Sequence, residues 1–150
     1  MKTMKRGFAL LLALTLLWAM GITAFAAEEK GSITIDNATV DVTYTIYRIF
    51  DLESYNAESG AYAYKVNDAW KNFAETLTDY VAVDAQGYVT WVEGADAAAF
   101  AKLALTYAKD NNIGNQGSQK ATGTEVKFEN LELGYYLVDS TLGALCSLNT

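Results

Sequence analysis

The sequence predicts a mainly β fold, an immunoglobulin-like β-sandwich into which two helices are inserted. Segments rich in β-branched and aromatic residues, which favour strands, lie towards both ends of the chain. Two segments with helical spacing of apolar residues lie between them. Strands and helices do not alternate regularly, so a parallel α/β sheet is disfavoured. A two-layer sandwich is the architecture that suits this order.

A leader precedes the predicted domain. Three basic residues stand before an uncharged run over residues 8–27 that contains Ala24-Phe25-Ala26: Lys2, Lys5 and Arg6. This pattern is typical of a secretory signal peptide over residues 1–26, cleaved after Ala26. The alternative is an uncleaved anchor, since about 20 uncharged residues are enough to span a bilayer. Gly21, Thr23 and the lack of a basic stop-transfer cluster favour cleavage and export.

Residues 27–150 have the size of one ordinary domain. The 150-residue chain has 11 basic and 18 acidic residues, and loss of the three basic leader residues brings the formal charge near −10. This charge disfavours a nucleic-acid partner. Cys146 is the only cysteine, so an internal disulfide is excluded. Because Leu145 and Leu148 flank it, we expect a buried, unreactive thiol.

A β-hairpin is predicted in the first half of the domain. Residues 32–35 and 44–52 carry the Ile, Thr, Tyr and Phe typical of strands. Residues 56–60, Asn-Ala-Glu-Ser-Gly, have the composition of a turn, and residues 61–66 resume an extended pattern. We therefore expect a hairpin over residues 44–66 with an exposed loop.

The first helix is predicted from Asp68 to near Tyr80, capped by Asn67 or Asp68. One stripe of this helix is apolar: Trp70, Phe73, Ala74 and Leu77. A turn over residues 84–87 and a strand over residues 88–92 follow.

The second helix is predicted to begin after Asp96 and to end at Asn112 or Gly114. Its expected core face carries Phe100, Leu103, Ala104 and Tyr107. Residues 114–123 are polar and small, which predicts a mobile surface loop. Two strands, residues 125–131 and 134–140, complete the pattern.

The composition excludes several kinds of catalytic site. The chain has no His, which rules out Ser-His-Asp and Cys-His sites and the usual zinc sites. Its acidic residues show no distinguishing context for glycosidase chemistry, and no phosphate-binding or calcium-binding loop is present. We therefore expect a protein that is not an enzyme and has no cofactor or metal.

The predicted strand over residues 134–140 carries an acidic residue in line with two apolar ones. Alternation along a strand puts Tyr135, Leu137 and Asp139 on one face. If Tyr135 and Leu137 pack inward, Asp139 follows them into the core, where burial favours the uncharged acid. Such an acid can polarise a neighbouring amide.

Three segments together resemble the isopeptide-forming pilins that sortases assemble on Gram-positive bacteria. They are GSITI at residues 31–35, YTIYRIFD at 44–51 and LGYYLVDS at 133–140. In order behind a leader, they resemble the N-terminal domain of a major pilin, and the resemblance covers most of residues 31–148. It implies a structural subunit of a surface pilus or fimbria, attached to the cell wall, with neighbouring subunits and a sortase as partners.

The resemblance also implies a possible intramolecular cross-link. In that family a lysine attacks an asparagine carboxamide, a buried acid shuttles the proton, and ammonia leaves. The segment Tyr-x-Leu-x-Asp-Ser at residues 135–140 is similar to the family's Tyr-x-Leu-x-Glu-Thr box, and this likeness implies that Asp139 is the acid. The motif position for the lysine holds Asp36, so Lys30 and Lys65 are the remaining candidates and Asn149 the candidate acceptor. Sheet packing without a cross-link is therefore expected to stabilise this chain.

Other pilin hallmarks are absent from residues 1–150. The chain has no Pro, which excludes the pilin motif, and no sorting signal is present. We expect a fragment of a longer surface protein, with the polymerisation residues beyond Thr150. The alternative function is a surface adhesin or carbohydrate-binding module that takes host or glycan ligands. Four aromatic residues are the candidates for stacking on sugar rings: Tyr62, Tyr64, Tyr88 and Trp91.

Overall fold

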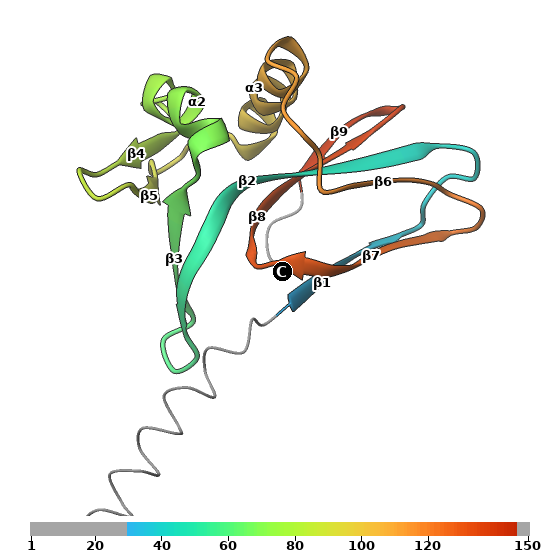
Figure 1. The fold of residues 1–150 in the computed structure, drawn as a ribbon, viewed down its shortest axis with the longest axis horizontal. Helices are drawn as coiled ribbons and strands as arrows, with labels where there is room; N and C mark the ends of the chain where they lie inside the picture. Colours follow the sequence, from blue (N-terminus) through green and yellow to red (C-terminus); the bar gives the residue numbers. More distant parts are fainter. Residues whose placement is uncertain (1–29, 147–150) are drawn as a thin grey trace, which may run out of the picture.

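The computed structural model describes the backbone of residues 30–146 and the side chains of residues 30–142 (Figure 1). The predicted signal peptide, Asn149 and the side chain of Cys146 lie outside this range. The elements in chain order are β1 (Lys30–Asp36), β2 (Thr43–Asn56), β3 (Ala61–Val66), a 3-10 turn η1 (Asp68–Trp70), α2 (Lys71–Thr76), β4 (Val81–Val83), β5 (Tyr88–Trp91), α3 (Ala97–Asp110), β6 (Gly117–Lys120), β7 (Glu125–Glu132), β8 (Gly134–Ser140) and β9 (Gly143–Cys146).

The predicted mainly β fold is confirmed, with antiparallel sheets arranged as a β-sandwich. A seven-stranded sheet has the order β4-β5-β3-β2-β8-β9, and β6 pairs with a further part of β2. A separate two-stranded sheet consists of β1 and β7. Helices α2 and α3 lie beyond the large sheet on the side away from β1 and β7 (Figure 1). The molecule therefore has three layers around β2 and β8.

Strand β8 and the part of β2 that pairs with it, from Tyr44 to Asp51, are covered on both faces. On the helix side they contribute to one cluster, the helix-side core, whose large members include Ile49, Phe50, Trp70, Phe73, Phe100, Tyr135 and Leu137. On the other side they contribute to the sandwich core, which includes Ile33, Tyr44, Ile46, Val126, Phe128, Tyr136 and Val138. Burial on two faces explains the nearly uninterrupted apolar run of β8.

The β2–β3 hairpin is confirmed: β3 spans the predicted residues 61–66, and β2 extends further than predicted. Strand β2 continues to Asn56, whose Oδ1 accepts hydrogen bonds from the amides of Glu58 and Ser59 at 3.0 Å. Gly60 closes the turn with a φ of 66°, a left-handed conformation that favours glycine. The hairpin loop is exposed, as expected.

The first helix is shorter than predicted. Asn67 does cap it, with Oδ1 accepting from the amide of Trp70 at 3.3 Å. Helix α2 nevertheless ends at Thr76, not near Tyr80. The amides of Tyr80 and Val81 both bond to the carbonyl of Leu77, and this turn starts the unpredicted strand β4. A tight turn over residues 77–80 therefore takes the place of the last expected turn of helix and leads into β4.

The second helix is confirmed. Asp96 caps α3 through Oδ1, which accepts from the amides of Ala98 at 2.9 Å and Ala99 at 3.1 Å. Phe100 and Ala104 are buried, but the placement of Leu103 on the core face was wrong, because its side chain is 40% exposed. The small residues Ala101 and Ala108 lie in the core instead, which lets α3 approach the sheet closely.

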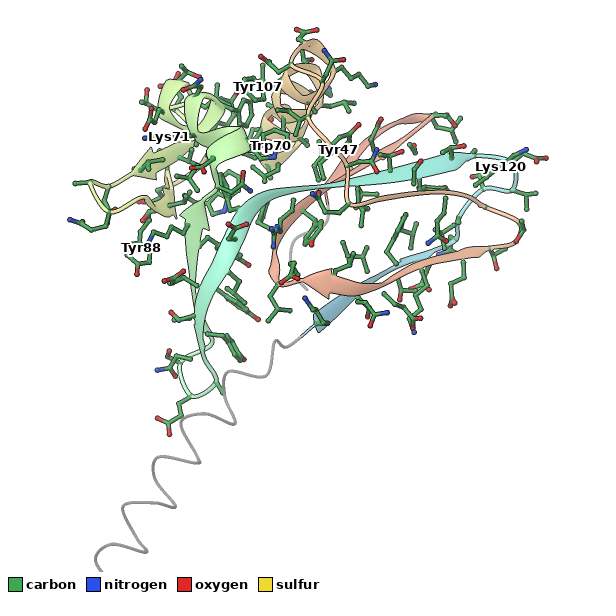
Figure 2. The ribbon with its side chains drawn as sticks, in the orientation of Figure 1. Tyr47, Trp70, Lys71, Tyr88, Tyr107 and Lys120 are labelled. Atoms are coloured by element: carbon green, nitrogen blue, oxygen red, sulfur yellow. The ribbon has the colours of Figure 1, made fainter. Side chains whose placement is uncertain are left out.

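The prediction of a surface loop over residues 114–123 was wrong in part: the segment is mostly exposed, but its middle is a strand. Residues 117–120 form β6, which pairs with β2 from Thr43↔Lys120 to Ile46↔Gly117. A Cβ at Gly117 would lie 2.8 Å from a ring carbon of Phe128, so glycine permits this close approach. Figure 2 shows Lys120 at the far end of this strand pair, where it forms an ion pair with Asp41 at 2.7 Å.

Candidate functional site

Asp139 lies on β8, between Thr45 of β2 and Ala144 of β9. Its side chain is 14% exposed, and Oδ2 lies 3.6 Å from Nζ of Lys109 on α3. Oδ1 is buried and has no hydrogen-bond partner among the described residues. Asp139 therefore lies towards the helices, like Tyr135 and Leu137, but at the edge of the helix-side core and beside a lysine.

The two oxygens of Asp139 differ in their environment. Lys109 is 60% exposed, so its pair with Oδ2 is well solvated and contributes at most about 1 kcal/mol. A buried oxygen without a hydrogen bond costs about 1–3 kcal/mol. Oδ1 is thus an acceptor able to bind a donor that reaches it, such as an amide or a protonated amine. This is the only chemically unusual carboxylate that we find among the described residues.

The lysines predicted from the sequence lie elsewhere. Lys30, on β1, forms an ion pair with Glu132 of β7. Lys65, on β3, has its Nζ 5.4 Å from the ring centroid of Tyr88, and β2 separates β3 from β8. Asp36 is exposed at the end of β1, and Asn149 lies outside the described residues.

Lys109 is the residue that the sequence analysis missed. It lies in the last turn of α3, where a basic residue is commonly explained by a favourable interaction with the helix dipole alone. Its proximity to Asp139 depends on how α3 lies across the sheet, which no local pattern in the chain encodes. The structure thus brings an acid and a lysine together, although not the lysines proposed.

We expect the chain without its predicted leader to carry no internal cross-link. Lys109 is well hydrated, and a lysine that attacks a carboxamide must be uncharged, which a dry site promotes. Intact-mass measurement should match the unmodified sequence. A mass lower by one ammonia, restored to the full value in Asp139→Ala, would contradict this expectation. Lys109→Arg, which keeps the positive charge but cannot form the amide, would then show whether Lys109 is the nucleophile.

A second feature is an aromatic ladder on the β2–β3 hairpin. Tyr55 and Tyr62 are 52% and 46% exposed, and their rings stack with centroids 4.7 Å apart. Tyr62 stacks in turn on Tyr64 at 6.1 Å, and Tyr64 meets Tyr135 edge to face at 6.0 Å. Burial, and to a lesser extent Tyr62, raises the pKa of Tyr64. The ladder therefore anchors two exposed rings to the helix-side core.

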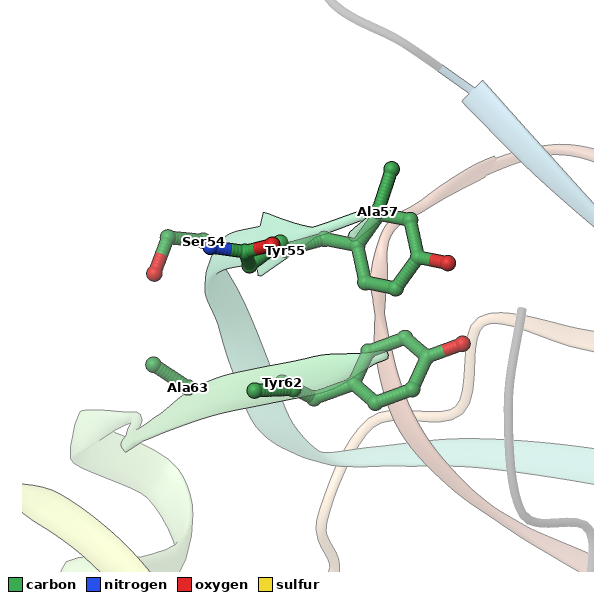
Figure 3. A pocket seen from close by; sticks show the side chains of 7 residues that line it. Ser54, Tyr55, Ala57, Tyr62 and Ala63 are labelled. Atoms are coloured by element: carbon green, nitrogen blue, oxygen red, sulfur yellow. The ribbon is translucent and has the colours of Figure 1, made fainter. Parts of the chain in front are cut away.

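A hollow of about 540 Å³ lies beside the exposed end of the ladder. Figure 3 shows the rings of Tyr55 and Tyr62 side by side, with both hydroxyl groups directed the same way. Ser54 and three alanines also line the hollow, and none of its lining residues is charged. The exposed carboxylates nearby in the hairpin, Glu53 and Glu58, disfavour an anionic ligand.

The four aromatic residues predicted to bind sugars do not form one platform. Lys65 is the register partner of Tyr88, and Tyr64 that of Val89, so Tyr88 lies on the opposite face from Tyr62 and Tyr64. Trp91 is partly buried against the helix-side core, where its ring packs on Phe100 with centroids 4.9 Å apart. Tyr55, which the sequence analysis placed beyond the strand, is the actual neighbour of Tyr62.

Residues 30–146 show neither a metal site nor a membrane-spanning helix. This part of the chain contains no group of three or more metal-ligating side chains. It also contains no helix of the length and hydropathy needed to cross a bilayer. No protein family, curated protein or solved structure matches the chain.

Proposed function

We propose that this chain is a structural module of a cell-surface pilus or fimbria and has no enzymatic role. The observation that carries this proposal is the pairing of β2 with β8. Two of the three segments that resemble pilins, residues 44–51 and 133–140, lie almost 90 positions apart in the sequence. They pair along their length, from Tyr44↔Ser140 to Asp51↔Gly134. The resemblance therefore falls on the two central strands of one structural unit.

The proposal also includes a specific type of β-sandwich and a cellular location. We infer an immunoglobulin-like sandwich in which α2 and α3 are an insertion between β3 and β6. The leader supports export, and sortase-dependent attachment to the cell wall follows from the resemblance. Neighbouring subunits and a sortase would be the partners, and the acidic balance disfavours nucleic acid.

The arrangement of β2 and β8 suits a load-bearing role. A force along these strands would load many antiparallel hydrogen bonds at once, because the strands overlap over most of β8. Both faces of the pair are covered by apolar cores, which exclude water from the bonds. The pair therefore resists separation without a covalent cross-link.

The function is tested by probing cell-wall extracts with an antibody against this domain. In the organism that encodes the chain, boiled extracts in detergent should give a ladder of high-mass bands, because sortase-joined subunits are linked by amide bonds. Deletion of the sortase should collapse the ladder to one band. A single band of unchanged mass in both strains would contradict a shaft function.

That negative outcome would favour the second candidate, a surface adhesin or carbohydrate-binding module. The observation in its favour is the exposed Tyr55–Tyr62 pair beside a neutral hollow. Aromatic faces beside hydroxyl groups suit an uncharged sugar, whereas the carboxylates of Glu53 and Glu58 oppose an acidic one. This candidate depends on Tyr55 and Tyr62 rather than on the four residues that the sequence suggested.

A further inference from the structure

The outer edge of β1 is a candidate surface for association. Strand β1 pairs with β7 along one edge, and no other strand of the described chain pairs with it. An edge of this kind presents backbone N–H and C=O groups that are able to accept a further strand. With seven residues, β1 is long enough to form several such bonds.

The sequence of β1 is complementary to itself when reversed. In an antiparallel pair of two β1 strands centred on Ile33, Lys30 of each copy lies opposite Asp36 of the other. Ser32 then lies opposite Thr34 of the second copy, and opposite charges and hydroxyl pairs are favourable cross-strand neighbours. Gly31 lies opposite Ile35, so the small residue leaves space for the larger one.

The burial pattern agrees with this register. The residues at alternate positions in β1 are exposed on one face: Lys30, Ser32, Thr34 and Asp36. Ile33 points the other way and belongs to the sandwich core. Pairing of two copies would therefore place all the complementary polar pairs on the solvent side and extend the apolar layer beneath them.

We propose that β1 is an association surface for β1 of a second copy of this chain. The two strands form a two-fold symmetric sheet in the order β7–β1–β1–β7. A two-fold symmetric contact needs a surface that is complementary to itself. Strand β1 meets this need, because the symmetry creates two Lys30–Asp36 pairs, one at each end of the contact. A parallel alignment in register is disfavoured, because it sets each charged residue beside its own copy. This inference does not depend on the proposed pilus function, and the experiment that tests it is independent of the test of that function.

The charges favour association through β1 in this register, whereas the net charge of the chain opposes non-specific association. The predicted mature chain has a formal charge near −10, so two copies repel each other at long range. Lys30 is also close to Glu132 on β7, so each end of the paired strands would hold one lysine between two carboxylates. At about 0.15 M salt, screening reduces the long-range repulsion more than it weakens touching pairs.

The association is tested by sedimentation equilibrium of the exported chain at that salt concentration. We expect a monomer–dimer equilibrium. Lys30→Asp and Asp36→Lys should each weaken it roughly tenfold, because each reversal makes two like-charged pairs by symmetry. The double variant Lys30→Asp/Asp36→Lys should regain the affinity of the parent, although its intrachain contact with Glu132 is lost.

Lys127→Asp is the matched control, since Lys127 is exposed on β7 and lies outside the proposed contact. This reversal should leave the dimer unchanged. A monomer at every concentration up to the millimolar range would overturn the proposal. So would a dimer that both single reversals leave intact, or a double variant that remains as weak as the single ones. Circular dichroism of each variant confirms that the fold is retained.

Discussion

Replacing Gly134 with alanine is expected to destabilise the domain by about 3 kcal/mol, at the upper end of the usual cost of overpacking. A Cβ at this position would lie 2.3 Å from the carbonyl oxygen of Phe50 and 2.9 Å from Cδ of Arg48. The carbonyl belongs to the backbone of β2 and cannot turn aside. Strands β2 and β8 would have to separate next to the register shift between Arg48 and Phe50.

Urea denaturation of Gly134→Ala measures this effect, and Gly114→Ala is its control. A Cβ at Gly114 meets no atom within 4 Å, so the control should change the free energy of unfolding by less than about 1 kcal/mol. If Gly134→Ala were as stable as the control, the close approach of β8 to Phe50 would be incorrect. The pairing that supports the proposed function would then be in question as well.

Phe100→Ala should lower the free energy of unfolding by about 3–5 kcal/mol. Phe100 is fully buried at the point where α3 meets the large sheet. Its ring lies within 6.5 Å, centroid to centroid, of five other aromatic rings: Phe50, Phe73, Tyr80, Trp91 and Tyr135. Truncation would leave a cavity that this rigid set of rings fills poorly.

Leu103→Ala provides the comparison for Phe100→Ala on the same helix. Leu103 is partly exposed and lies outside both cores, so its truncation should cost less than about 1 kcal/mol. Chemical denaturation followed by tryptophan fluorescence suits both variants, because Trp70 and Trp91 lie in or against the helix-side core. Equal losses in the two variants would show that α3 packs through a different face.

The sequence predicted those elements whose apolar residues follow a clear period. Strands β1, β2, β3, β5, β7 and β8 and helix α3 were expected near their observed positions. Strand β6 was missed because its residues, Gly-Ser-Gln-Lys, carry no β signal and pair with β2 through the backbone. Strand β4 was missed because three residues are too short to show alternation.

At the candidate site, too, the sequence predicted what one segment determines by itself and missed what depends on contacts between distant segments. Alternation along β8 was enough to assign Asp139 to the face of Tyr135 and Leu137. Lys109 reaches Asp139 only because α3 crosses the sheet at that point. Tyr55 meets Tyr62 because β2 runs past residue 52, and the bulge between Leu52 and Ser54 sets their register. Strand ends and bulges depend on partner strands, which the periodicity of one segment does not specify.

The pairing of β2 with β8 also sets an order of events for the newly made chain. The β2–β3 hairpin is local and can form as soon as residue 66 is available. The central pair of β2 and β8 cannot form completely until residues near 140 have been synthesised, because Tyr44 pairs with Ser140. The central pair, and the two cores that it separates, therefore remain unformed for most of the synthesis of the chain. For the export that we propose, this delay would keep the chain in a state suited to translocation until nearly all of residues 30–140 have passed.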